Sequence, residues 1–88
     1  MISETITVEN TRGIHIRPAA TFAAQMSAFD AQIRLACGGR EANGKSLLGL
    51  VAAQIPCGAQ VCVTCDGPDE AEMLEHATAL IRARFWEQ

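Results

Sequence analysis

Short segments in which apolar and polar residues alternate recur along this 88-residue chain, and they constrain its fold more than any other feature. Residues 2–8, 32–37 and 60–66 have the period of two that is typical of β-strands. The positions expected to point inward in the first two segments are Ile6, Val8, Ile33 and Leu35. Strands with one polar face need a cover on the other face only, which predicts a sheet under a single layer of helices.

A turn signal joins the second alternating segment to a short return strand. Gly38 and Gly39 follow that segment, and residues 40–43 are expected to pair back on it as a hairpin. Together with the helices described next, this gives the order βαββαβα. The sequence therefore predicts an α+β fold of the open-faced β-sandwich type.

Three helical segments separate or follow the strands. The first is expected to begin near residues 16–18, where strong helix formers with little charge follow. The second opens at Ser46 and ends at about residue 53. In the third, Asp69 and Glu72 have the spacing of a capping box. Its buried stripe is predicted to consist of Leu74, Ala77 and Ile81.

Composition limits the function mainly by exclusion. The formal net charge of −3, with no basic cluster, argues against nucleic acid as the partner. No apolar run reaches the length of a membrane span, and the N-terminus lacks the pattern of a secretory signal. We therefore expect one domain over residues 1–88, located in the cytoplasm and without membrane association.

The four cysteines suggest a metal or disulfide site, but the spacing does not favour one. Cys62 and Cys65 have C-x-x-C spacing within a predicted strand, where positions three apart point to opposite faces. A zinc site also needs two further well-placed ligands, and Cys37, Cys57 and two histidines are what remains. We expect reduced, partly buried thiols with Cys62 the most exposed, and no bound metal.

Residues 13–20, with the sequence GIHIRPAA, place a histidine, an arginine and a proline where the first helix starts. Pro18 is tolerated in a first turn, where a backbone N–H has no partner inside the helix. His15 then lies at or just outside the helix N-terminus. Gly13 gives the approaching loop the freedom to turn.

A histidine in this place suits phosphoryl chemistry. The orphan N–H groups and the positive end of the helix dipole favour an anion and a neutral imidazole, whose nitrogen is a nucleophile. His15 and Arg17 converge because the chain is not yet helical at His15, and a guanidinium fits phosphate oxygens. A histidine beside an arginine is usually a solvated pair, so the ordered set with Gly13 and Pro18 carries the interpretation.

These residues resemble the histidine-containing phosphocarrier (HPr) family of the bacterial phosphoenolpyruvate-dependent phosphotransferase system. The family pattern G-[LI]-H-x-R-P-A matches residues 13–19 at every fixed position, and residues 43–50 are similar to the family's regulatory-serine segment. The resemblance covers essentially the whole chain. It implies a four-stranded antiparallel sheet covered on one face by three helices, which periodicity alone does not separate from other small α+β folds.

The resemblance implies a role for each motif residue. His15 would accept a phosphoryl group from Enzyme I and pass it to an Enzyme II A component, with Arg17 as its electrostatic partner. The chain would then be a stoichiometric carrier and not an enzyme, would need no cofactor, and is expected to be a monomer. The alternative is a regulatory paralogue, nitrogen-type or controlled by a serine kinase, that acts mainly by binding partners.

Ser46 has two compatible interpretations. It is a plain N-cap whose hydroxyl satisfies an orphan N–H, and the resemblance implies a regulatory site for an HPr serine kinase/phosphorylase. The resemblance also implies a docking patch for Enzyme I and Enzyme II A components, in keeping with the apolar surfaces of transient partner sites. The patch residues are Ile16, Ala20, Ala24, Leu47, Leu48 and Val51, whereas Leu50 is expected to face the core.

Several positions depart from the family pattern. Ile16 replaces the usual Ala or Thr and makes the rim of the site bulkier, and Gln54 stands where Gly is common, which leaves the conformation of that turn open. Phe85 and Trp86 extend the usual end of the chain and are expected to pack at the terminus. His76, mid-way along the last helix, is expected to be a solvated residue.

Overall fold

The computed structural model describes residues 1–86 and has the element order βαββαβα. The strands are β1 (Ile2–Thr7), β2 (Gln32–Cys37), β3 (Arg40–Asn43) and β4 (Gln60–Asp66). The helices are α1 (Ile16–Met26), α2 (Leu47–Ala52) and α3 (Glu70–Arg82), followed by the short 3₁₀ helix η1 (Arg84–Trp86). Every strand and helix expected from the sequence is present, and the strand bounds and helix starts agree with the expected ones within one or two residues.

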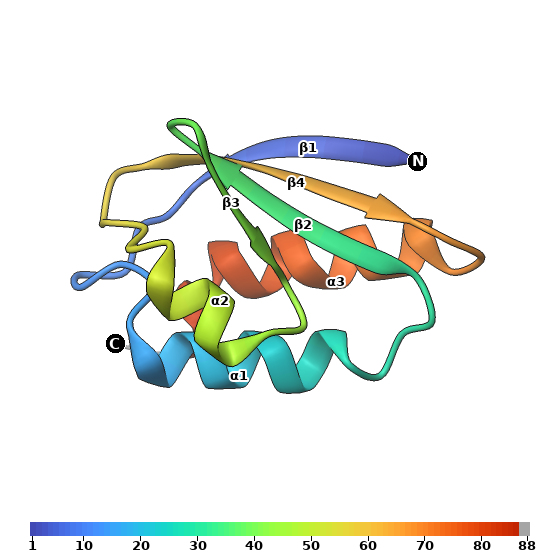
Figure 1. Ribbon diagram of the computed structural model, residues 1–88, viewed down its shortest axis with the longest axis horizontal. Coiled ribbons are helices and arrows are strands. Elements are labelled where there is room, and N and C mark those ends of the chain that lie inside the picture. Colours follow the sequence, from blue (N-terminus) through green and yellow to red (C-terminus); the bar gives the residue numbers. More distant parts are fainter. Residues whose placement is uncertain (87–88) are drawn as a thin grey trace.

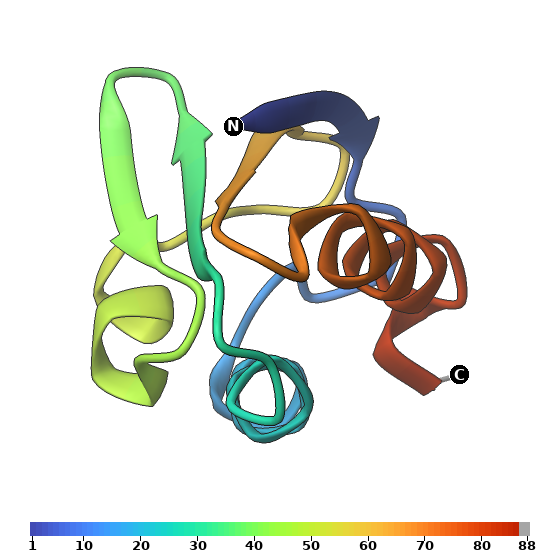
Figure 2. The same cartoon turned by 90° about the vertical axis from the view of Figure 1, so that its right-hand side faces the viewer.

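The four strands form one antiparallel sheet in the order β1-β4-β2-β3. All three helices lie against the same face of this sheet, with α3 packed on β1 and β4 and α2 packed on β3 (Figures 1 and 2). The other face is open. The predicted open-faced β-sandwich is therefore confirmed.

The core lies between the sheet and the helices. The inward-pointing residues predicted above are all buried: Ile6, Ile33 and Leu35 lie in strands, and Val8 directly follows β1. Val61, Val63 and Cys65 of β4 complete this layer. From the helices the core receives Phe22 and Met26 of α1 and also the following side chains: Leu50, Met73, Leu74, Ala77, Leu80 and Ile81. The predicted stripe on α3 is thus buried. No helix within residues 1–86 has the length and apolar character needed to cross a membrane.

The predicted capping box at the start of α3 is wrong. Asp69 does occupy the N-cap position, but its side chain makes no capping hydrogen bond. Its carboxylate instead accepts the backbone N–H groups of Asp30 and Ala31, at 2.9 and 2.7 Å. The loop before β2 approaches so closely that a Cβ on Gly67 would lie 2.5 Å from Ala31 Cα. These two amides are available to Asp69 only because the fold brings them there.

Candidate functional site

His15 occupies the N-cap of α1, as its sequence context predicts. Its backbone is extended, with φ −90° and ψ −167°, and its carbonyl accepts the first helical hydrogen bond from Ala19 N at 3.0 Å. The side chain is half-buried. Since the amides of the first helical turn have no acceptor inside the helix, they point toward the region where a group attached to His15 would lie.

Gly13 and Asn10 hold the conformation of the loop between β1 and α1, which leads into His15. Gly13 has φ +66°, in the left-handed region that favours glycine, and donates its N–H to Asn10 O at 3.0 Å. The buried Asn10 side chain donates in return from Nδ2 to Gly13 O. The predicted turning role of Gly13 is therefore confirmed. The structure adds a close approach to Ile55, whose carbonyl oxygen would lie 2.3 Å from a Cβ on Gly13.

Arg17 lies in the first turn of α1, and its side chain is exposed. Pro18 is buried and is the third residue of the helix. A backbone N–H in this first turn has no acceptor inside the helix, so the N–H that proline lacks costs no helical hydrogen bond. The site therefore combines a half-buried imidazole, a helix N-terminus and an exposed guanidinium in the first turn of the helix. This combination can bind and stabilise an anionic group attached to the imidazole.

The six apolar residues predicted to form a docking patch lie on α1 and α2, two helices that pack together, and Ile16 directly follows His15. Leu48 is 81% exposed and Ile16 is 65% exposed, which are large values for aliphatic side chains. Ala20 and Ala24 are also exposed, and Leu47 and Val51 are half-buried. We call these six residues the α1–α2 patch. Leu50 of the same helix is fully buried, so α2 has one apolar residue in the core and others at the surface, as predicted.

Ser46 is the N-cap of α2. Its Oγ accepts the backbone N–H of Gly49 at 3.0 Å, and its own carbonyl accepts Leu50 N at 3.0 Å. The predicted capping function is confirmed. The side chain is half-buried at the edge of the α1–α2 patch, next in sequence to Leu47.

The cysteines are all free thiols, and one expectation about them is wrong. Cys62 is half-buried, and the exposed thiol is Cys57, in the turn before β4. Cys62 and Cys65 do lie on opposite faces of β4, with Cys65 fully buried. Burial raises the pKa of the Cys65 thiol to about 11, which makes it unreactive at neutral pH. Within residues 1–86, no group of three or more histidine, cysteine or acidic side chains is placed to hold a metal.

Two expectations about aromatic residues need correction. His76 is half-buried between helices: its Nε2 lies 3.0 Å from Gln25 Oε1 and its ring centroid 5.7 Å from that of Phe29. Phe85 packs at the terminus as expected, edge-on to Phe22 at 5.9 Å. Trp86 does not, since it is 62% exposed. The helical period of α3 does not show whether His76 faces α1 or solvent, so the contact with Gln25 could not be predicted from it.

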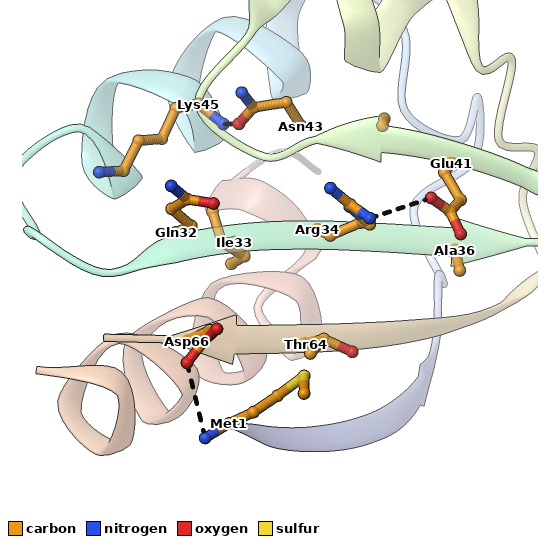
Figure 3. A pocket seen from close by; sticks show the side chains of 11 residues that line it. Met1, Gln32, Ile33, Arg34, Ala36, Glu41, Asn43, Lys45, Thr64 and Asp66 are labelled. Carbon is orange, nitrogen blue, oxygen red and sulfur yellow. Dashed lines mark hydrogen bonds and ion pairs between the residues drawn. The ribbon is translucent and has the colours of Figure 1, made fainter. Parts of the chain in front are cut away.

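The open face of the sheet carries a polar hollow away from the helices (Figure 3). Arg34 and Glu41 form an ion pair at 3.4 Å across the β2–β3 hairpin on this face. At the other end, the N-terminal ammonium of Met1 lies 3.7 Å from Asp66. The charges in the hollow are therefore largely paired with one another. Asn43 and Lys45, at the start of the second motif, line it, whereas His15, Arg17 and Ser46 do not.

Carboxylates at the start of α3 have lowered pKa values. Hydrogen bonds from the N–H groups of Asp30 and Ala31 lower the pKa of Asp69, and the N–H of Gly67 lowers that of Glu70. Glu70 also accepts the Met1 ammonium at 3.1 Å, which raises the pKa of that ammonium. These groups lie at the opposite end of the helical layer from the start of α1 (Figure 1). They therefore belong to the framework of the fold.

Comparisons with known proteins agree with this geometry. The family model described as the PTS HPr component phosphorylation site matches residues 2–83. The phosphocarrier protein HPr of Haemophilus influenzae is 36% identical over 81 residues, which is 92% of this chain and 95% of that protein. The HPr-like protein Crh of Bacillus subtilis is 30% identical over 82 residues, or 93% and 96% of the two chains.

Among solved structures, HPr from Thermoanaerobacter tengcongensis superposes with a TM-score of 0.94 at 33% identity. The superposition covers 100% of this chain and 99% of that one. The match spans the fold as well as both sequence motifs. The chain therefore belongs to the HPr family of phosphocarrier proteins of the phosphotransferase system.

Proposed function

We propose that His15 is the phosphoryl acceptor of this carrier. Enzyme I would supply the group from its own phosphohistidine, and an Enzyme II A component would receive it. The observation that carries the proposal is the placement of His15 at the N-cap of α1, with Arg17 in the first turn. We expect the carrier to act in the cytoplasm as a monomer and without a cofactor.

The transfer is an in-line displacement. A neutral ring nitrogen of His15 attacks phosphorus as the bond between phosphorus and the Enzyme I histidine nitrogen breaks, and that donor histidine leaves as a neutral imidazole. The three phosphoryl oxygens then lie near the first-turn amides of α1 and within reach of Arg17. These donors stabilise the negative charge until the Enzyme II A histidine attacks in the same way.

The α1–α2 patch is proposed as the surface that receives each partner. It is apolar, it borders His15, and its most exposed members project from two different helices. A patch of this kind suits brief association, since a carrier must release one partner before it meets the next. Ser46 lies at its edge, so phosphorylation by an HPr serine kinase/phosphorylase would place negative charge within the docking surface.

A regulatory role is the second candidate, and the match to the HPr-like protein Crh favours it. Such a paralogue would act mainly by binding partners through the same patch. The two functions differ in the fate of the phosphate. A carrier for sugar uptake delivers it to a sugar-specific Enzyme II A component, whereas a regulatory paralogue does not.

The proposal is tested by incubation with Enzyme I and labelled phosphoenolpyruvate. We expect acid-labile label on the wild type and none on His15→Ala, with His76→Ala as the matched control that removes the other histidine. Arg17→Ala should fold normally and accept phosphate at least about tenfold more slowly, because an electrostatic donor is lost while the nucleophile remains. Label that persists on His15→Ala would show that another residue is the acceptor.

A further inference from the structure

The turn between α2 and β4 is tied directly to the loop that carries His15. Ile14 donates its backbone N–H to Ile55 O at 2.8 Å, and both of these side chains are buried. Gly13 approaches so closely that a Cβ on it would lie 2.3 Å from Ile55 O. Because Ile14 immediately precedes His15, the position of Ile55 fixes the backbone from which the imidazole projects.

The position of Ile55 depends in turn on Gln54. This residue has φ +51°, in the left-handed region that is costly for any residue with a Cβ. Its N–H bonds to Val51 O at 3.1 Å, so the chain reverses direction at the end of α2. A left-handed conformation at a residue other than glycine persists only where its surroundings hold it.

Arg40 supplies such a hold from the first position of β3. Its Nη1 donates to Ala53 O at 3.1 Å in a partly buried contact. Ala53 is the C-cap of α2, and a carbonyl in that place lies at the negative end of the helix without an acceptor role inside it. The guanidinium both satisfies this carbonyl and offsets its partial charge, and it fixes the residue immediately before Gln54.

We propose that Arg40 is a positioning residue for phosphoryl transfer at His15. Its bond to Ala53 holds the left-handed turn at Gln54, and the turn holds Ile14 through Ile55. The inference rests on the proposed function of His15. Arg40 itself touches neither the imidazole nor the phosphoryl group in this scheme, so it acts on the geometry of the acceptor and not on the chemistry.

The first test is amide hydrogen exchange measured by NMR on the unphosphorylated protein. In Arg40→Ala we expect the Ile14 amide to exchange about tenfold faster, while the core amide of Val63 keeps its rate. Arg40→Lys should restore the slow rate, since one ammonium donor suffices for one carbonyl. Arg34→Ala is the matched control, because Arg34 pairs with Glu41 on the open face.

The second test is steady-state transfer from Enzyme I. In Arg40→Ala the misplaced acceptor should lower kcat by on the order of fivefold. The KM of the transfer from Enzyme I should stay within about twofold of the wild-type value, because the α1–α2 patch is unchanged. A rise in KM with constant kcat would make Arg40 a docking residue and overturn the proposal. So would an Ile14 exchange rate that stays at the wild-type value, or that rises only together with that of Val63.

Two further outcomes can be told apart: a variant that does not fold, and a wild type that accepts no phosphate. If Arg40→Ala does not fold, Arg40→Met keeps the aliphatic stem, removes only the donors and is judged by the same criteria. If the wild type accepts no phosphate from Enzyme I, the proposed function is wrong. The exchange experiment still decides whether Arg40 controls the loop at Ile14, because it needs neither Enzyme I nor phosphate.

Discussion

Single residues decide how the β1–α1 loop reaches the N-terminus of α1. Gly13 combines a left-handed φ with direct backbone contact to Ile55 and Pro56, so two separate restrictions exclude a side chain there. Its neighbour Ile14 then forms the hydrogen bond to Ile55. The sequence motif indicates the first restriction, because a turn before a helix often needs glycine. It cannot indicate the second, because Ile55 lies far along the chain.

Gly13→Ala should destabilise the fold by about 3 kcal/mol and slow phosphoryl transfer, since the new Cβ is strained in φ and also collides with backbone. The matched control is Gly38→Ala, where φ is +54° and a Cβ would meet nothing within 4 Å. That variant should lose only about 1 kcal/mol and transfer normally. Urea unfolding and labelling by Enzyme I measure the two effects. Equal losses in both variants would contradict a role for the Ile55 contact.

At the scale of elements, local sequence signals account for most of the fold. The start of α1 follows from Pro18 and the start of α2 from Ser46, and the strands follow from their period of two. These signals were sufficient because each acts within one turn or one strand. The polar face of the strands also predicts a single layer of helices, and the resemblance implies that the sheet is antiparallel with four strands. The order of the strands within the sheet, β1-β4-β2-β3, was not predicted, because it depends on contacts between distant segments.

The errors at Asp69 and His76 share one physical cause, which is contact between residues distant in sequence. Asp69 has the spacing of a cap, yet it bonds to a loop that precedes β2. His76 has the context of a surface residue, yet it meets Gln25 of another helix. At Gln54 the sequence left the turn open, and the bond from Arg40 to the end of α2 could not be foreseen. At the site, the motif predicts that His15 lies at the start of α1. It does not predict the turn at Gln54 or the hydrogen bond from Arg40.

Ser46→Asp tests α2 as a docking element. Asp and Ser cap helices about equally, so the free energy of unfolding should change by less than about 1 kcal/mol. Transfer from Enzyme I should slow, because a fixed negative charge then borders the α1–α2 patch. Ser46→Asn keeps the cap without the charge and should transfer at the wild-type rate. If Asn and Asp slow transfer equally, charge at the patch is not the cause.

At the scale of the whole molecule, a few long-range contacts join the ends of the elements. Arg82 at the end of α3 bonds to Glu4 of β1, and the ring of Phe85 packs on Phe22 of α1. Asp69 joins the start of α3 to the segment between α1 and β2 through two backbone amides. Of the three contacts just named, the Asp69 contact is made by a carboxylate with a lowered pKa.

This contact predicts how stability depends on pH. The N–H groups of Asp30 and Ala31 lower the pKa of Asp69 in the folded protein, so the unfolded chain takes up this proton first as the pH falls. The stabilisation is therefore complete above the ordinary carboxyl pKa of 3.8 and is lost as the pH drops through that value and then through the folded pKa. Glu70, whose pKa is lowered by Gly67, contributes with the same sign.

Asp69→Asn should be less stable than the wild type at pH 7, because its one amide oxygen cannot replace two carboxylate oxygens that each accept a backbone N–H. The difference in the free energy of unfolding should shrink as the pH falls below 3.8, since the wild type then loses its ionised carboxylate. Urea unfolding of both proteins at a series of pH values measures this difference in the free energy of unfolding. Asp30→Asn is the control, because it removes a carboxylate from the same loop and leaves Asp69 bonded. A stability difference between Asp69→Asn and the wild type that stays constant from pH 7 to pH 2 would show that the charge of Asp69 does not hold the loop.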